Sequence, residues 1–165
     1  MKINFIKHEV FILTLMGAFQ HNKIYNKNAS EADKIKFRKY LELSLNKITD
    51  IYKQKVSEND HLHCLDELKF SIEKTHKDIL FNGQISFGTV QKILNLYLKY
   101  LWSIGLISEP PHCPIDSIIL SRLHDYSTKW TKIEKETYIN IIEKIKKIIN
   151  NKSIAEWELI EFNRR

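Results

Sequence analysis

The residue types best suited to chemistry gather in one stretch of the second half of the chain. Lys92, Asn95 and Lys99 recur at helical spacing, so they share one face of a helix. A histidine and an aspartate follow within the proline-rich residues 110–116. An amine, an imidazole and a carboxylate are the groups that nucleophilic and general acid–base catalysis use. The candidate catalytic residues are therefore Lys92, His112 and Asp116.

The stretch that carries the histidine and the aspartate should be rigid, because its three prolines restrict φ. Asp116 stands directly before an apolar run, where a carboxylate caps a helix and is stabilised as an anion by the helix dipole. A plain cap and a rigid catalytic site both explain this aspartate, and three prolines in one short loop favour the site. We expect His112 and Asp116 to line the same concave surface as Lys92.

The element that must position Lys92 is the most apolar predicted helix, residues 87–104, capped by Ser86 and closed by Gly105. Its apolar face is expected to comprise Val90, Ile93, Leu94, Tyr97, Leu101 and Ile104. The opposite face is either a solvated lysine face or an edge that contacts an anion. The candidate binding residues are Gln91, Asn95, Lys99 and Trp102. Tyr97 could stack on a base, but its spacing favours packing in the core.

Hydrophobic periodicity and capping signals predict an all-α protein of about six helices in one domain, residues 1–165. Only 4 glycines and 3 prolines interrupt it, which argues against turn-rich β architectures. The pattern predicts a mostly buried first helix over 3–19, a polar break at 57–63, a turn at Asn82-Gly83 and a short helix from 118. Capping boxes are predicted at Ser30–Asp33, Thr131–Glu134 and Ser153–Glu156.

The net charge of +6 suits an anionic partner, so we expect nucleic acid or a nucleotide. Part of the lysine excess has another explanation, because a chain rich in Lys, Ile and Asn is typical of AT-rich coding. Two cysteines make no disulfide framework, which favours a reduced, cytoplasmic protein. The apolar run at 10–19 is too short to span a bilayer, and no membrane partner is expected.

Two histidine–cysteine groups offer metal-ligand types, namely His61, His63 and Cys64, and His112 with Cys113. Their spacing is not that of paired ligands, so we expect no metal and no cofactor. The sequence also lacks a Walker loop, a dinucleotide fingerprint and a nucleophile elbow.

The central stretch resembles a group of small uncharacterised bacterial and phage proteins. The residues that carry this resemblance are Gly88-Thr-Val-Gln-Lys92-Ile-Leu-Asn95-Leu-Tyr-Leu-Lys99-Tyr-Leu101 and then His112-x-Pro114-x-Asp116. Trp130 and Glu156-Trp157-Glu158 fit the same group. The resemblance covers roughly the C-terminal half and implies a family but no activity. Phage or bacterial defence is instead one context for a non-enzymatic binding module of this size.

A more distant similarity is to helix-hairpin-helix DNA glycosylases. Gly88 matches their hairpin, Lys92 their catalytic lysine, and Pro114-Ile-Asp116 their proline-x-aspartate. The second hairpin glycine is missing and the gap from Lys92 to Asp116 is long, which puts the phosphate clamp in doubt. The similarity implies cleavage of an N-glycosidic bond, with Asp116 stabilising the oxocarbenium-like sugar or activating water, Lys92 as nucleophile and His112 orienting Asp116 or donating to the leaving base.

The alternative function is a non-enzymatic module that binds a nucleotide, a second messenger or a protein. An aromatic and basic patch near the C-terminus has the composition of a binding hot spot, and the same aromatic residues could instead fasten the last helix to the core. The patch comprises Trp130, Trp157, Phe162, Arg164 and Arg165.

Overall fold

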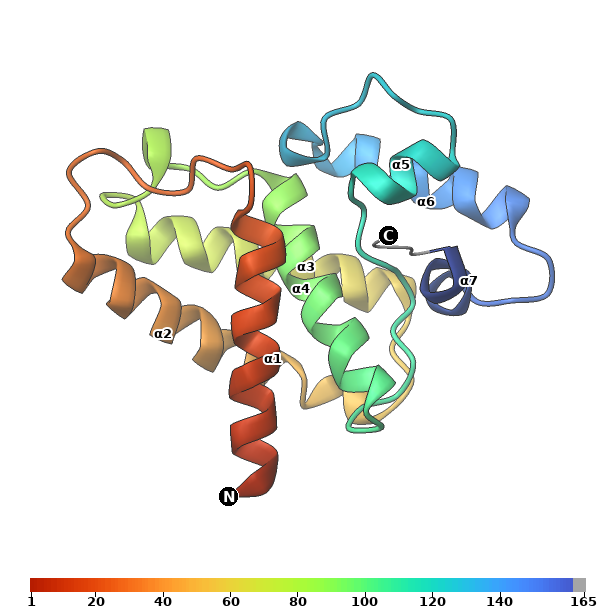
Figure 1. Ribbon diagram of the computed structural model, residues 1–165, viewed down its shortest axis with the longest axis horizontal. Helices are drawn as coiled ribbons and strands as arrows, with labels where there is room; N and C mark the ends of the chain where they lie inside the picture. The colour runs from red at the N-terminus through yellow and green to blue at the C-terminus, as the bar shows by residue number, and fades with distance from the viewer. Residues whose placement is uncertain (162–165) are drawn as a thin grey trace.

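Seven α-helices and three short 3₁₀ turns make up the computed structural model, which describes residues 1–161 (Figure 1). Over these residues the chain forms no strand, only an isolated bridge between Tyr25 and Leu80. The all-α prediction is confirmed, with one helix more than the expected count. The helices are α1 (Lys2–Phe19), α2 (Glu31–Ile48), α3 (Glu58–His76), α4 (Phe87–Ser103), α5 (Ser117–Arg122), α6 (Lys135–Ile148) and α7 (Ile154–Glu161), and the turns are η1 (Ile51–Lys53), η2 (Phe81–Gly83) and η3 (Trp130–Lys132).

Helix α4 is the centre of the fold, as its apolar sequence predicts. It runs between α1 and α3 on one side and the α5–α7 region on the other (Figure 1). Ser86 begins it by accepting a hydrogen bond from the Thr89 amide at 3.1 Å. Gly105 ends it with φ near +74°, which a glycine adopts at no steric cost. Of the six residues predicted for its apolar face, only Ile104 is exposed, because it lies at the C-cap beyond the packed part of the helix.

Helix α1 is less buried than its sequence suggests. Only the side that crosses α4 is covered, through Val10, Phe11, Thr14, Leu15 and Ala18. Phe5 and Met16 on other sides are 61% and 67% exposed. The prediction of a mostly buried first helix is therefore wrong, because an apolar run all around a helix does not reveal which of its sides the rest of the protein covers. Among the described residues, the helices are too short or too polar to cross a membrane.

The capping signals are confirmed at two of the three positions. Ser30 and Asp33 form a reciprocal capping box, and the Ser153 side chain accepts from the Glu156 amide. Thr131 caps nothing, because it lies in η3 and Glu134 itself occupies the N-cap of α6.

The Asn82-Gly83 turn is confirmed, since both residues have positive φ. The predicted polar break at 57–63 is wrong beyond its first residue, because the following residues are helical. Ser57 caps α3, and the polar residues that follow form the first turns of that helix.

Candidate functional site

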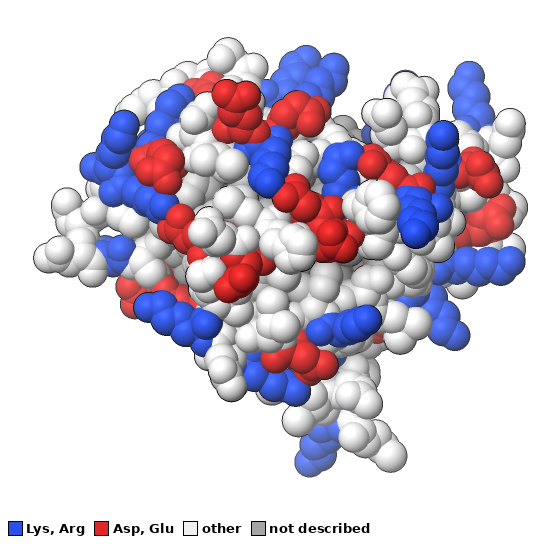
Figure 2. All heavy atoms as spheres, turned by 180° about the vertical axis from the view of Figure 1, so that it is seen from behind, with Lys and Arg blue, Asp and Glu red and all other residues white. Residues whose placement is uncertain are grey.

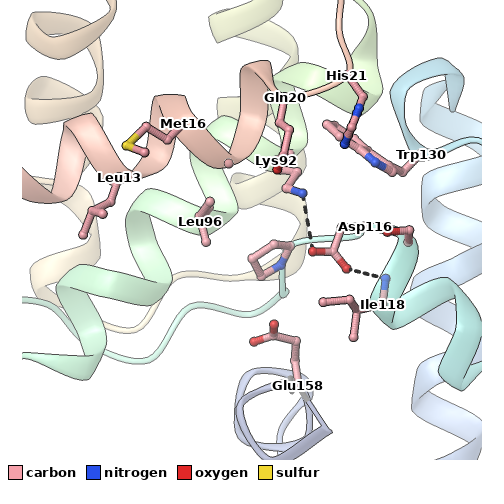
Figure 3. A pocket seen from close by; sticks show the side chains of 13 residues that line it. Leu13, Met16, Gln20, His21, Lys92, Leu96, Asp116, Ile118, Trp130 and Glu158 are labelled. Carbon is pink, nitrogen blue, oxygen red and sulfur yellow. Dashed lines mark hydrogen bonds and ion pairs between the residues drawn. The ribbon is translucent and has the colours of Figure 1, made fainter. Parts of the chain in front are cut away.

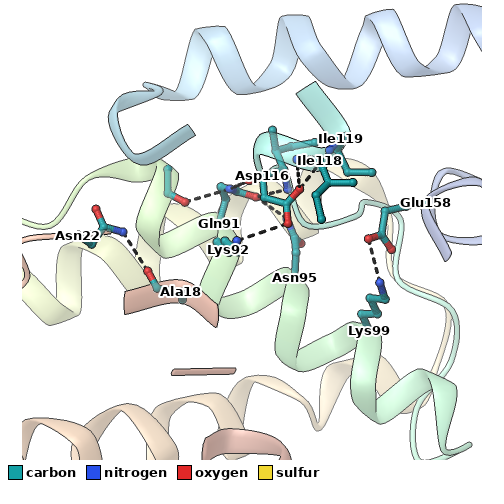
Figure 4. Close-up of polar contacts among 12 residues, drawn as sticks. Ala18, Asn22, Gln91, Lys92, Asn95, Lys99, Asp116, Ile118, Ile119 and Glu158 are labelled. Carbon is teal, nitrogen blue, oxygen red and sulfur yellow. Dashed lines mark hydrogen bonds and ion pairs between the residues drawn. The ribbon is translucent and has the colours of Figure 1, made fainter. Parts of the chain in front are cut away.

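Residues 110–116, here called the strap, cross α4 and lead into α5. Two buried amide side chains of α4 hold the strap backbone (Figure 4). Gln91 binds both polar groups of Ile115, donating to its carbonyl at 2.7 Å and accepting from its amide at 3.0 Å. Asn95 donates to the Cys113 carbonyl at 3.0 Å. Both amide side chains are fully buried, so they fasten the strap instead of lying on a solvated face.

The two lysines of the same helix face bind carboxylates. Lys92 Nζ lies 3.4 Å from Asp116 Oδ2, and Lys99 Nζ lies 2.8 Å from Glu158 Oε1 on α7 (Figure 4). All four side chains are at most 11% exposed. Charges this deeply buried must be paired, because an unpaired one would lose its hydration without compensation. Of the two alternatives for this helix face, the solvated lysine face is therefore wrong. The sequence alone does not show that these lysines are buried.

Asp116 is both a helix cap and a member of this ion pair. Its Oδ1 accepts hydrogen bonds from the amides of Ile118 and Ile119 at 3.0 and 3.1 Å. Its Oδ2 is the atom near Lys92. The two functions use different oxygens, so the capping geometry fixes the direction in which the second oxygen points.

A pocket of about 750 Å³ opens beside this pair (Figure 3). Lys92, Asp116 and Glu158 contribute its charged walls, and Trp130 of η3 lies next to them. The Lys92 ammonium lies over the Trp130 ring, 4.2 Å from its centroid. The remaining walls are Leu13, Met16, Gly17, Gln20, His21, Leu96, Pro114, Ser117 and Ile118. A pocket of this size accommodates a ligand as large as a nucleotide.

Lys92 and Asp116 therefore line one concave surface, as predicted, but His112 does not join them. The His112 side chain is turned into the core, where its Nδ1 lies 2.9 Å from the Tyr138 hydroxyl. The prediction failed because the spacing of His112 from Asp116 does not tell which way each side chain of an extended strap points.

His112 belongs instead to a buried cluster with His61. The two imidazole rings pack edge to face with centroids 4.7 Å apart. Each Nδ1 faces a tyrosine hydroxyl, Tyr138 for His112 and Tyr52 for His61 at 2.7 Å. Burial lowers the pKa of both imidazoles to about 3. Neutral histidines thus fill this part of the core.

Two other candidates also lie outside the pocket. Trp102 is half-buried near the C-terminal end of α4 and lines none of the pockets found among the described residues. Tyr97 packs in the core, as its spacing favours, and its hydroxyl donates to Asn46 at 3.1 Å. Neither aromatic ring is placed to stack on a molecule bound beside Asp116.

The C-terminal patch is only partly described. Phe162, Arg164 and Arg165 lie outside the described residues, while Trp157 is buried against the core. Trp130 belongs to the pocket instead. Among the described residues, no three His, Cys, Asp or Glu side chains lie close enough together to hold a metal ion.

Glu158 is the pocket residue that our sequence reasoning missed as a site. It appeared there only as part of a resemblance, and a glutamate on a short terminal helix gives no local signal of burial. Its pairing with Lys99 of α4 depends on the tertiary structure, so no local signal in the sequence could have found it.

The positive net charge is dispersed. Figure 2 shows basic and acidic side chains interspersed over one face of the molecule, with no continuous basic surface there. Several lysines bind acidic partners, including Lys135 with Asp66 and Lys146 with Glu58. Positive charge on this face is therefore largely matched by nearby acids, which a broad nucleic-acid-binding surface would not require.

No protein-family model, curated protein or solved structure matches this chain.

Proposed function

We propose that the protein binds a nucleoside or nucleotide in the pocket beside Asp116 and hydrolyses its N-glycosidic bond. The observation that carries the proposal is the carboxylate of Asp116, which lines the pocket beside Lys92 while its Oδ1 is held by two backbone amides. Breaking an N-glycosidic bond leaves positive charge on the sugar. A fixed, partly desolvated carboxylate stabilises that charge and can also accept a proton from the attacking water.

Lys92 acts in this proposal as the counterion of Asp116 rather than as the attacking group. Its ammonium lies 3.4 Å from the Asp116 carboxylate and 4.2 Å from the centroid of the Trp130 ring, so it makes an ion pair and a cation–π contact. A lysine must be neutral to attack a sugar carbon. Water is therefore the proposed nucleophile.

A second candidate function is binding without reaction. It is favoured by one observation, namely that the Lys92–Asp116 pair is complete without a ligand. A module that only binds a nucleotide would use the pocket walls and leave this pair as a structural fastening of the strap.

The test incubates the full chain with nucleosides, 5′-nucleotides and single-stranded oligonucleotides and measures release of free base by liquid chromatography. Asp116→Asn should lower the rate by about 10²–10⁴-fold. The matched control is Asp125→Asn, because Asp125 caps a turn through the amides of Ser127 and Thr128 outside the pocket. Saturable binding with no base release would favour the second candidate.

Oligonucleotides separate a nucleic-acid partner from a small ligand in the same experiment. Binding to a nucleic acid should weaken steeply as salt rises, because each neutralised phosphate releases counterions. A free nucleoside should show little salt dependence. If neither class binds at low salt, the proposal fails.

A further inference from the structure

Glu158 brings a second carboxylate to the same pocket from a different element. It projects from α7 towards the strap that carries Asp116 (Figure 3). Its side chain is only 2% exposed, although its helix lies at the surface of the fold. A glutamate is rarely buried unless it is paired, and Lys99 supplies the pairing charge at 2.8 Å.

The two carboxylates have different surroundings. Two backbone amides donate hydrogen bonds to Asp116. Within residues 1–161 the Glu158 carboxylate accepts instead from the Lys99 ammonium, and burial raises its pKa even though Lys99 opposes the shift. The other charged groups that act on Glu158 are Asp116, which raises its pKa further, and Lys92, which lowers it. Two carboxylates with such different surroundings in one pocket are typical of an acid and a base that act on the same bond.

We propose that Glu158 is the general acid that protonates the departing base, an inference that rests on the proposed hydrolysis of an N-glycoside. The geometry that supports it is the position of Glu158 and Asp116 on the walls of one pocket, with the strap residue Pro114 also lining it. Asp116 stabilises the charge on the sugar and accepts a proton from the attacking water, and Glu158 protonates the leaving base.

The step balances as follows for a purine nucleoside. The bond between the sugar C1′ and the base nitrogen breaks, and its electron pair stays on the base. The reacting form carries a proton on the Glu158 carboxyl, whose Oε1 still accepts the hydrogen bond from Lys99. This proton moves to the base, and a water oxygen bonds to C1′ while one water proton moves to Asp116. Solvent then carries a proton from Asp116 back to Glu158, so the net reaction is addition of one water across the bond.

The test compares guanosine with 7-methylguanosine as substrates. The methylated base already carries a positive charge, so it leaves without needing a proton. Glu158→Gln should lower guanosine hydrolysis by about 10²–10⁴-fold and change 7-methylguanosine hydrolysis by less than about tenfold. Glu161→Gln is the matched control on the same helix, because Glu161 binds Arg122 and lines no part of the pocket.

A second variant keeps the test valid if Glu158→Gln folds poorly because the buried Lys99 ammonium loses the Glu158 carboxylate. Lys99→Met retains the carboxyl group and removes the charge that lowers its pKa. The high-pH limb of the guanosine rate should then move to higher pH, since the acid keeps its proton longer. A purely structural Glu158 would leave the position of that limb unchanged.

The outcomes separate the two proposals. Equal losses on both substrates in Glu158→Gln, or an unmoved pH limb in Lys99→Met, would overturn the assignment of Glu158 while leaving N-glycoside hydrolysis standing. A wild-type chain that releases base from neither of these substrates, nor from any nucleoside, 5′-nucleotide or oligonucleotide of the first test, would remove the proposed function and this inference with it.

Discussion

Gly88 of α4 lies directly against the backbone of Trp130, and a Cβ built on Gly88 would stand 1.9 Å from the Trp130 carbonyl oxygen. The Gly88 amide also donates to the Ile133 carbonyl at 3.0 Å. The missing side chain thus allows η3 to approach α4 closely enough to bring the Trp130 ring over Lys92. Gly88 therefore allows close packing of η3 on α4, and this explanation does not depend on its match to a hairpin glycine.

We therefore expect Gly88→Ala to lower the free energy of unfolding by about 1–3 kcal/mol, because the backbone of η3 must move to admit a methyl group. Chemical denaturation with tryptophan fluorescence would measure it. Gly17→Ala is the control, since the added Cβ there meets only the end of the flexible Leu96 side chain. Equal stability of Gly88→Ala and the wild type would show that η3 does not depend on this contact.

The Lys92–Asp116 pair gives a second prediction, about stability. Asp116→Asn can keep both backbone hydrogen bonds but leaves a buried ammonium, so the loss should reach up to about 3–5 kcal/mol. Adding Lys92→Met removes that ammonium and should recover most of the loss. A double-mutant cycle by urea denaturation measures the coupling between the two residues. Additive losses would mean that Asp116 acts in stability only as a cap.

The helices could be predicted because their signals are local. Ser30, Ser57 and Ser86 accept hydrogen bonds from amides three residues onward, and Gly105 takes the positive φ that ends α4. The proximity of Lys92 to Asp116 could also be predicted, because the short loop after α4 returns the chain along that helix.

The rest of the candidate site could not be predicted, because it depends on contacts between distant segments. Lys99 and Glu158 are 59 positions apart, so nothing local shows that both charges are buried together. Similarly, whether His112 points to the pocket or to Tyr138 depends on α6, which lies beyond the strap in the sequence. Side-chain direction along an extended segment is set by such neighbours and not by spacing.

The third prediction concerns acid. His61 and His112 have pKa values of about 3 in the fold against an ordinary value of 6.5, so the unfolded chain binds more protons between these limits. Stability is therefore fully present above pH 6.5 and is lost as the pH falls through that value towards 3. The loss should be about 1.4 kcal/mol per pH unit for each imidazole.

Urea denaturation at several pH values between 7 and about 5.5 would measure this slope, above the range in which most carboxylates titrate. His61→Gln should reduce the slope of unfolding free energy against pH by the contribution of roughly one proton. His63→Gln serves as the control, because His63 lies exposed on the same helix. A slope that His61→Gln leaves unchanged would contradict a neutral buried His61.

The last prediction uses the two thiols as reporters of the strap. Cys113 belongs to the strap and its side chain is buried in the core, and burial raises the pKa of this thiol well above its ordinary value. Cys64 is only half-buried, and burial raises its pKa less severely. Because the thiolate is the reactive form, a disulfide reagent at pH 8 should modify Cys64 slowly and Cys113 only when the strap opens.

In a Cys64→Ala variant, the rate at which the remaining thiol of Cys113 is modified therefore measures strap opening. A nucleoside bound beside Asp116 should slow it further, since binding stabilises the closed strap. Rapid modification of Cys113 in the folded protein, at the rate seen in urea, would show that Gln91 and Asn95 do not hold the strap closed.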